Sequence, residues 1–206
     1  MAKHKQAYPP DWARRKIVKQ SVSLAGAPLL GAVATGLLFG ANRSEAALTP
    51  ACQDAEPTMS QGAGPFYTSN SPLRDNLREP SLEGESMRLS GRVLNQFCEP
   101  VNGAILDFWH ADSHGVYDNR GYRLRGHLFA DSDGFFALNT IVPGLYPGQT
   151  RHIHVITQGR DTRRLTTQLY FPDEAGNQRD FGFNTRLELM PLAEKMDFQF
   201  DFVLQG

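Results

Sequence analysis

The sequence predicts an all-β fold, an antiparallel β-sandwich with an irregular N-terminal arm. Short stretches in which apolar and polar residues alternate are separated by turn signals such as Asn102-Gly, Pro143-Gly and Pro147-Gly. No stretch carries a convincing helical repeat. Many short strands joined by turns are typical of two packed antiparallel sheets.

Three strands are predicted in the first part of this domain. Residues 87–94 alternate between apolar and polar, and residues 104–109 form an apolar run that reads as a buried strand. Residues 135–138 begin another strand directly after the turn at Asp131-Ser-Asp-Gly134.

The C-terminal part predicts one strand and one short helix. Phe198, Phe200 and Phe202 alternate with polar residues, which indicates a strand with one buried face. Residues 187–195 are the one predicted helix, although Pro191 opposes it because proline removes a backbone donor.

Composition divides the chain into three parts. Residues 1–46 carry seven Lys or Arg against two acids, whereas residues 47–206 carry 14 basic and 20 acidic residues. Residues 47–86 are rich in Pro, Ser and Gly and are predicted to form the irregular arm, and residues 87–206 the sandwich. Because the body is acidic, it offers no surface for phosphates, and we expect no nucleic-acid partner.

The N-terminal part resembles an export signal. Arg14-Arg-Lys-Ile-Val-Lys19 precedes an uncharged, Gly- and Ala-rich run and then Ser44-Glu-Ala46. This order is typical of a twin-arginine signal over residues 1–46, so we expect a periplasmic or secreted protein whose signal contacts the membrane transiently. The alternative is a retained membrane anchor, which the glycines, Pro28 and the modest hydrophobicity of the run disfavour.

Cys52 and Cys98 are the two cysteines of the chain. Both lie in the part expected to be exported, and an oxidising compartment favours a disulfide between them. Two unpaired, buried cysteines are the alternative. Since neither cysteine belongs to a Cys-x-x-Cys motif or lies near a histidine pair, a thiolate metal site is disfavoured.

Four residues form a candidate ligand set for iron(III). His152 and His154 are two residues apart in a predicted strand, so their imidazoles point to the same side and can meet one metal. Tyr117 and Tyr146 stand nearby in sequence, and phenolate oxygens are hard ligands that stabilise iron(III). Each tyrosine by itself would be read as a core or rim residue, and the pair of histidines by itself is weak evidence.

The context of these residues decides the interpretation. Six motifs occur in order between about residues 60 and 175, and each is common by itself. In this order and spacing they resemble the intradiol ring-cleavage dioxygenases, with a core closer to the protocatechuate type. The motifs are Gly64-Pro-Phe-Tyr67, Gly91-Arg-Val with Pro100-Val-Asn-Gly-Ala104, Trp109 to Tyr117, Asp131-Ser-Asp-Gly134 with Thr140-Ile-Val-Pro-Gly144, Tyr146 to His154, and Thr167-Gln-Leu-Tyr-Phe171.

The resemblance implies a prealbumin-like sandwich with a non-haem iron(III) ion held by Tyr117, Tyr146, His152 and His154. It implies an enzyme that uses O2 to open a catechol-type ring between the two hydroxyl-bearing carbons, giving a muconic-type dicarboxylate. Tyr146 would leave the metal as the diol binds and would take up a substrate proton. The implied partners are a small aromatic diol and O2, and a homo-oligomer is left open.

The resemblance also implies residues around the metal. Gln168 would act beside the iron, and Gly64 and Pro65 would form one wall of the substrate pocket. Gln149 would contact substrate at a position where the family commonly has an arginine, and a neutral amide cannot supply that charge. Arg151 is the candidate to compensate, but strand alternation points it away from the metal.

Two other functions fit parts of the sequence. A non-catalytic, prealbumin-like secreted binding module would share several motifs but would not need Tyr117 and both histidines. A double-stranded β-helix enzyme with iron(II), copper or zinc would need a third histidine or a carboxylate, and none follows the pair at a suitable spacing. We expect the other histidines of the domain, His110, His114 and His127, at solvated or turn positions.

Overall fold

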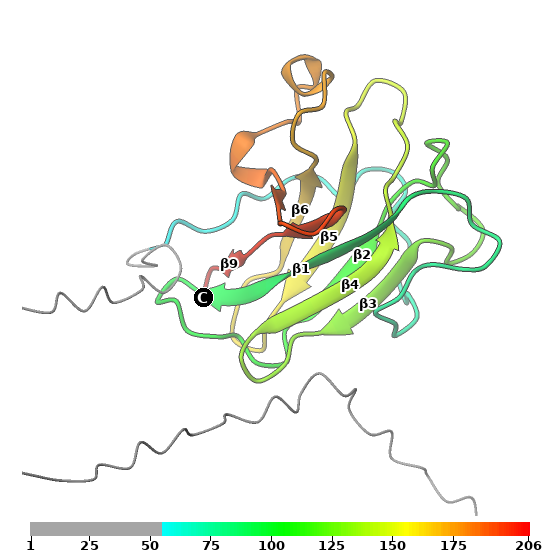
Figure 1. Cartoon of the computed structure of the whole chain (residues 1–206). Helices are drawn as coiled ribbons and strands as arrows, with labels where there is room; N and C mark the ends of the chain where they lie inside the picture. The colour runs from blue at the N-terminus through cyan, green and yellow to red at the C-terminus, as the bar shows by residue number, and fades with distance from the viewer. Residues whose placement is uncertain (1–54) are drawn as a thin grey trace, which may run out of the picture. The chain divides into compact units, whose positions relative to one another are not determined.

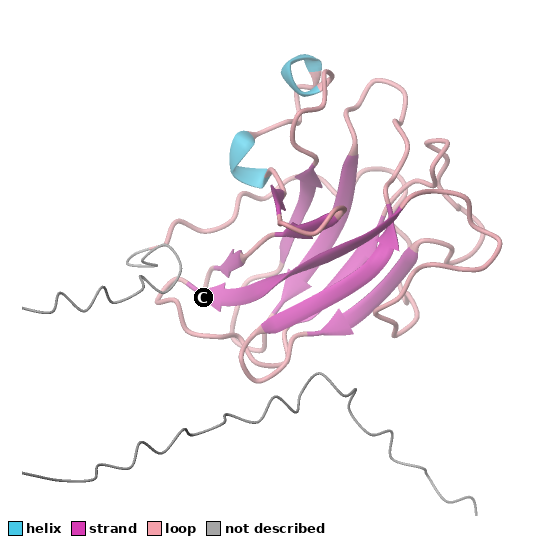
Figure 2. Ribbon diagram, in the orientation of Figure 1, coloured by secondary structure: helices cyan, strands magenta, loops and turns pink. Residues whose placement is uncertain are grey.

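The structure is a computed structural model that describes residues 55–206. The predicted export signal and Cys52 lie outside these residues, whereas Cys98 is disulfide-bonded. Figure 2 shows strands and loops, with two single 3-10 turns, η2 (Asn177–Arg179) and η3 (Thr185–Leu187). The predicted all-β fold is therefore confirmed. In this part of the chain, no helix has the length and apolar character needed to cross a membrane.

Two sheets enclose the core, and in the view of Figure 1 strands β1 and β4 lie in front of β2 and β5. The first sheet has the order β4 (Phe135–Ile141), β1 (Ser86–Asn95), β8 (Asp197–Gln199) and β7 (Met190–Pro191), and β9 (Phe202–Leu204) also pairs with β1. The second has the order β3 (Arg125–Phe129), β2 (Ile105–Trp109), β5 (His152–Gln158) and β6 (Leu165–Tyr170). All neighbours in the second sheet are antiparallel, whereas β8 and β9 run parallel to β1.

The core lies between the inner faces of these sheets. Every second residue of a strand points inward, so Leu106 and Phe108 of β2 and Ile153 and Val155 of β5 are fully buried there. Burying one such side chain stabilises the fold by about 1.5–3 kcal/mol. The outer face of the second sheet is thereby left to residues with other roles.

The predicted helix over residues 187–195 is wrong. Leu187 ends the turn η3, and Met190–Pro191 forms the short strand β7. Leu187 and Leu189 are both buried while Glu188 between them is not, which is the period of an extended chain. The backbone N–H of Leu189 donates to the carbonyl of Tyr170, so this segment continues the edge of the sandwich.

The predicted C-terminal strand is interrupted. Phe198 lies in β8 and Phe202 in β9, and both are buried, but residues 200–201 between them belong to neither strand, although both strands pair with β1 in the same register. At this point the chain passes close to Gly91 of β1, where a Cβ would lie 1.8 Å from the carbonyl oxygen of Phe200. Only glycine allows this approach, and the strand breaks where it happens.

The irregular arm crosses from β9 to β3 over the second sheet. The backbone N–H groups of Thr58, Gln61 and Arg74 donate in turn to carbonyls of β9, β6 and β3. Between these anchors, the ring of Tyr67 packs on Trp109 of β2 with centroids 4.9 Å apart. The arm thus covers part of the outer face to which His152 and His154 point.

Candidate metal centre

The outer face of the second sheet owes its polar character to strand alternation. In β5, Ile153 enters the core, so His152 and His154 point to the opposite side, where both are 3% exposed. Residues directly opposite one another in antiparallel strands share a face, and His154 lies opposite both Trp109 and Gln168. The two imidazoles and the Gln168 amide therefore lie on one surface.

Three polar atoms converge on this face. The hydroxyl oxygen of Tyr117 lies 3.0 Å from Nε2 of His152 and 3.1 Å from Nε2 of His154, and the two Nε2 atoms are 3.1 Å apart. Nδ1 of His154 has no partner among residues 55–206, so no hydrogen bond fixes the proton of this ring, and its Nε2 can present a lone pair. The two Nε2 atoms and the phenol oxygen can therefore all turn a lone pair toward one cation.

The protonation state of the cluster suits a cation. Nδ1 of His152 lies 2.7 Å from the Thr150 carbonyl, which can only accept, so Nδ1 holds the proton and Nε2 presents its lone pair. Burial lowers the pKa of His152 and lowers the pKa of His154 to about 2, so both rings are neutral at pH 7. Burial also raises the pKa of the Tyr117 phenol, whose ionisation therefore needs a nearby positive charge.

The spacing fits a transition-metal ion. Two donors about 2.1 Å from a metal and about 90° apart are separated by about 3.0 Å, the spacing of these three atoms. Neutral imidazole and phenolate are also suitable donors for iron(III). Within residues 55–206, no group of three or more His, Cys, Asp or Glu is placed to bind a metal, so this site depends on tyrosine.

Tyr117 reaches the histidines from the loop between β2 and β3. Its ring is buried and stacks on Phe66 of the arm, with centroids 4.5 Å apart. The buried guanidinium of Arg125 donates to the carbonyls of Asp118 and Phe66 and so ties the residue after Tyr117 to the arm. Sequence reasoning missed Arg125, because a lone arginine near a turn is normally solvated.

Tyr146, the fourth predicted ligand, lies beside the three-atom cluster. Its half-buried ring packs edge-on against Tyr117 and Phe66, with centroids 5.8 and 5.3 Å away. Unlike that of Tyr117, its hydroxyl makes no hydrogen bond to either histidine in the described part of the chain. The structure thus brings three predicted ligands together and places the fourth next to them.

The other predicted site residues border the cluster to different degrees. Gly64 has φ +67°, a conformation that favours glycine, and a Cβ there would lie 3.5 Å from Cε1 of His154. Pro65 is exposed beside it. The buried Gln168 donates from Nε2 to the carbonyl of Gly62 at 3.5 Å, which joins β6 to the arm.

Gln149 and Arg151 stand on the approach to β5. The half-buried Gln149 closes a tight turn in which its N–H donates to the Tyr146 carbonyl at 3.0 Å. Arg151 is engaged elsewhere, since its guanidinium forms a 2.6 Å ion pair with Glu174 and donates to the carbonyl of Pro143. Its charge is therefore balanced away from the three-atom cluster.

The expectation for His110 is wrong. This residue is 1% exposed, and its Nδ1 donates to the carbonyl of Ala111 while its Nε2 accepts from the Thr140 hydroxyl, both at 2.7 Å. Burial lowers its pKa to about 4. Two internal partners replace water here, which a sequence pattern does not reveal. His114 is exposed, as expected, and His127 is half-buried.

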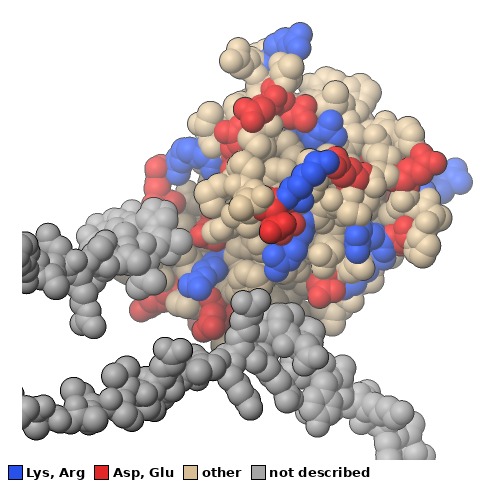
Figure 3. All heavy atoms as spheres, in the orientation of Figure 1, with Lys and Arg blue, Asp and Glu red and all other residues tan. Residues whose placement is uncertain are grey.

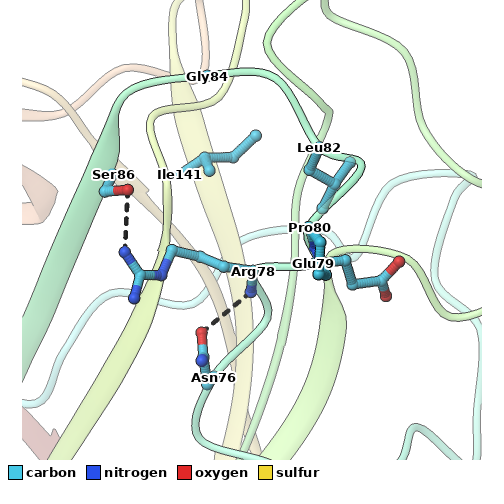
Figure 4. Close-up of a pocket in the computed structure, with 8 residues that line it drawn as sticks. All are labelled: Asn76, Arg78, Glu79, Pro80, Leu82, Gly84, Ser86 and Ile141. Atoms are coloured by element: carbon cyan, nitrogen blue, oxygen red, sulfur yellow. Dashed lines mark hydrogen bonds between the residues drawn. The ribbon is translucent and has the colours of Figure 1, made fainter.

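Other surface features lie away from the cluster. A hollow of about 310 Å³ lies where the arm meets the end of β4, and its lining in Figure 4 includes Arg78, Leu82 and Ile141 but none of the candidate ligands. On the face shown in Figure 3, acidic and basic side chains are interspersed. Neither feature adds a donor to the metal cluster.

Comparisons with known proteins agree with this geometry. Residues 63–206 match the family model described as "Dioxygenase". The dioxygenase domain of a dioxygenase carbohydrate-binding protein fusion from Streptomyces sp. SirexAA-E is 45% identical, with a TM-score of 0.70 over 73% of this chain and 99% of that one. Hydroxyquinol 1,2-dioxygenase from Pseudomonas putida DLL-E4 is 25% identical, with a TM-score of 0.67 over 75% of this chain and 68% of that one.

A curated relative extends the comparison. Catechol 1,2-dioxygenase from Pseudomonas sp. (strain EST1001) is 25% identical over 176 residues, which cover 70% of this chain and 58% of that protein. The chain thus spans little more than half the length of that relative. The match of most of the described domain to the family model, together with the Streptomyces structure, shows that the chain belongs to the intradiol ring-cleavage dioxygenase family.

Proposed function

We propose that this protein is a non-haem iron(III) intradiol dioxygenase that cleaves a catechol-type aromatic between its two hydroxyl-bearing carbons. The observation that carries the proposal is the convergence of Tyr117, His152 and His154 within 3.1 Å of one another in a member of this family. The chemistry that iron(III) supplies when bound is activation of the chelated diol toward O2, and both oxygen atoms of O2 enter the muconic-type dicarboxylate.

The side chains have distinct roles in this proposal. His152, His154 and Tyr117 would hold the ion, and their burial would limit the access of water to it. Tyr146 is the ligand proposed to leave, because this residue is half-buried and its hydroxyl has no bond to either histidine in the part of the chain that is described. As a tyrosinate ligand that leaves when the diol binds, it would take up a proton from the diol and become a neutral phenol, which makes it a base as well as a ligand.

Gln168 and Gln149 act on the substrate side. Gln168 shares a face with His154, so its amide can bond to a diol held at the metal. Gln149 can donate hydrogen bonds to the substrate but adds no charge, and Arg151 is neutralised by Glu174. We therefore expect slower turnover than with a cation at position 149, because charge that develops on the ring is less stabilised.

The test is the visible absorption of the iron-loaded protein before and after anaerobic addition of catechol or protocatechuate. We expect a tyrosinate-to-iron(III) charge-transfer band that weakens in Tyr117→Phe and Tyr146→Phe and shifts when the diol binds. Tyr122→Phe is the matched control, because Tyr122 lies in the same loop as Tyr117 but donates to the carbonyl of Ser69. With O2 admitted, the diol should give a ring-opened dicarboxylate.

A colourless protein that takes up no iron would overturn the proposal. It would favour the non-catalytic prealbumin-like binding module, which has no need of the cluster. An iron-loaded protein that binds the diol but forms no ring-opened product would retain the metal centre and reject the reaction.

We also propose that residues 1–46 direct export to the periplasm or beyond. The support is the twin-arginine pattern at Arg14 and Arg15. Replacement of both arginines by lysine should hold the protein in the cytoplasm, which cell fractionation measures. Unchanged export of this variant would contradict the assignment.

A further inference from the structure

We propose that residues 171–182, the segment after β6, act as a positioning clamp that orients His152 through Thr150. This inference rests on the proposed function, because it concerns how one candidate iron ligand is held. Thr150, Asn177 and Asp180 are positioning residues in this sense, since they act on the metal site through His152.

Thr150 uses all of its polar groups in this arrangement. It is 2% exposed, and its carbonyl accepts the Nδ1 proton of His152 at 2.7 Å. Its hydroxyl donates to Oδ1 of Asn177 and its backbone N–H donates to Oδ2 of Asp180, also at 2.7 Å each. The side chains of Asn177 and Asp180 therefore fix Thr150, whose carbonyl orients the imidazole of His152.

The clamp is itself held in place. Nδ2 of Asn177 donates to the carbonyl of Phe171 at 3.0 Å, and Oδ1 of Asp180 accepts from the N–H of Gly182 at 2.8 Å. The carbonyl of Gly182 in turn accepts from the side chain of Gln61 in the arm. These bonds restrict the two clamp residues to one arrangement.

Packing adds to the polar contacts. A Cβ at Gly176 would lie 3.2 Å from Oγ1 of Thr150, so the segment packs closely against Thr150. The next residue, Arg151, pairs with Glu174 of the same segment at 2.6 Å. Residues 171–182 therefore contact both Thr150 and Arg151, the two residues that precede His152.

The two histidines are held by different means. His154 lies flat on Trp109, with ring centroids 4.8 Å apart and an angle of 2°, and its buried Nδ1 has no partner within residues 55–206. His152 instead has a fixed Nδ1 donor bond. Loss of the hydrogen-bond partner of a ligating histidine typically lowers metal affinity or activity about 10–100-fold. The clamp should therefore affect the metal through His152.

The first experiment compares iron release in full-length variants. Thr150→Val keeps the shape of the side chain and removes its hydroxyl, and Asn177→Ala removes the other end of the bond. Both variants keep the Thr150 carbonyl and loosen only what holds it, so we expect them to lose iron(III) to a chelator up to about tenfold faster. Thr150→Ser, which retains the hydroxyl, should restore the wild-type rate.

Thr157→Val is the matched control. Thr157 lies in β5, is fully buried, and its hydroxyl has no partner in the described part of the chain. The same chemical change there should leave iron release at the wild-type rate. If Thr150→Val and Thr157→Val accelerate iron release equally, the effect comes from a general loss of stability around β5, and the clamp is overturned.

A second measurement needs no metal. Long-range 15N–1H NMR of the imidazoles in the metal-free protein should show His152 held with the proton on Nδ1. We expect Thr150→Val and Asn177→Ala to mix the two tautomers, and Thr157→Val to leave the spectrum unchanged. A single unchanged tautomer in all variants would overturn the clamp.

The two measurements separate the clamp from the enzyme. If the wild-type protein takes up no iron, the proposed function is rejected, and the tautomer measurement still tests the clamp. If the wild-type protein shows the charge-transfer band but the Thr150→Val variant releases iron at the wild-type rate, the proposed function stands and the clamp is rejected.

Discussion

The two faces of the second sheet are built by the same strands, but their buried side chains have different partners. The inner face carries fully buried apolar residues such as Leu106, Ile153 and Leu169, whose partners are other apolar side chains. The outer face carries His152 and His154, which are buried almost as fully but whose Nε2 atoms meet each other and the Tyr117 hydroxyl. Burial by itself therefore does not distinguish core from site.

Both faces hold buried polar atoms with no partner among residues 55–206, which on the outer face are Nε1 of Trp109 and Nδ1 of His154, so the faces differ instead in how their polar residues are oriented. On the inner side, the buried hydroxyls of Thr157 and Thr167 have no partner among residues 55–206. Beside the outer face, every polar group of Thr150 is bonded. A core can carry an unpaired hydroxyl at a cost of about 1–3 kcal/mol, whereas a metal centre needs its surroundings oriented.

The largest expected effect is on the outer face. His154→Gln removes one of the three converging donors and should lower ring-cleavage activity at least ~10³-fold, or about 4 kcal/mol in barrier. Metal-free stability should change by less than about 2 kcal/mol, because the His154 ring makes few polar bonds. Dioxygen uptake with catechol and urea unfolding measure the two quantities. A variant with normal iron content and normal uptake would remove His154 from the site.

The neighbouring residue should give the reverse result. Ile153→Ala opens a cavity in the core and should destabilise the metal-free protein by about 2–5 kcal/mol in urea unfolding. The charge-transfer band should keep its position wherever the variant is folded, because the side chain points away from the metal. A large change in the band with little loss of stability would contradict the division between the faces.

A pH effect is expected beside the outer face, at His110. Its pKa is about 4 in the folded protein and about 6.5 when unfolded, so the unfolded chain binds an extra proton between these values. The stabilising contribution is present above pH 6.5 and is lost as the pH falls toward 4, by at most about 1.4 kcal/mol per pH unit. In metal-free protein, His110→Gln should flatten this slope relative to the wild type. Equal slopes would place the His110 pKa near its ordinary value.

The smallest effect is expected on the inner face. Thr157→Val replaces a buried, unpartnered hydroxyl by a methyl group of similar shape and should stabilise the protein by about 1 kcal/mol. Urea unfolding of the metal-free variant measures this gain. A loss of 1 kcal/mol or more would indicate that the hydroxyl has a water partner.

Local periodicity predicted much of the fold but not its interruptions. The alternation in residues 87–94 and the apolar run at 104–109 correspond to β1 and β2. The three phenylalanines at the C-terminus also alternate, yet the strand breaks where Phe200 crosses Gly91. A pattern within one segment cannot report a close approach by another segment. The helix predicted over residues 187–195 failed for a related reason, since pairing with the Tyr170 backbone outweighed local preference.

The sequence by itself determined that His152 and His154 share a side, because side-chain alternation is a property of the extended backbone. It also carried the ordered motifs that identify the family. Only the tertiary structure decided that Tyr117, 35 residues before His152, brings its hydroxyl to both imidazoles. The same holds for Asn177, whose bond to Thr150 spans 27 residues. Contacts of this kind depend on how loops pack across a finished sheet, and no local pattern encodes that packing.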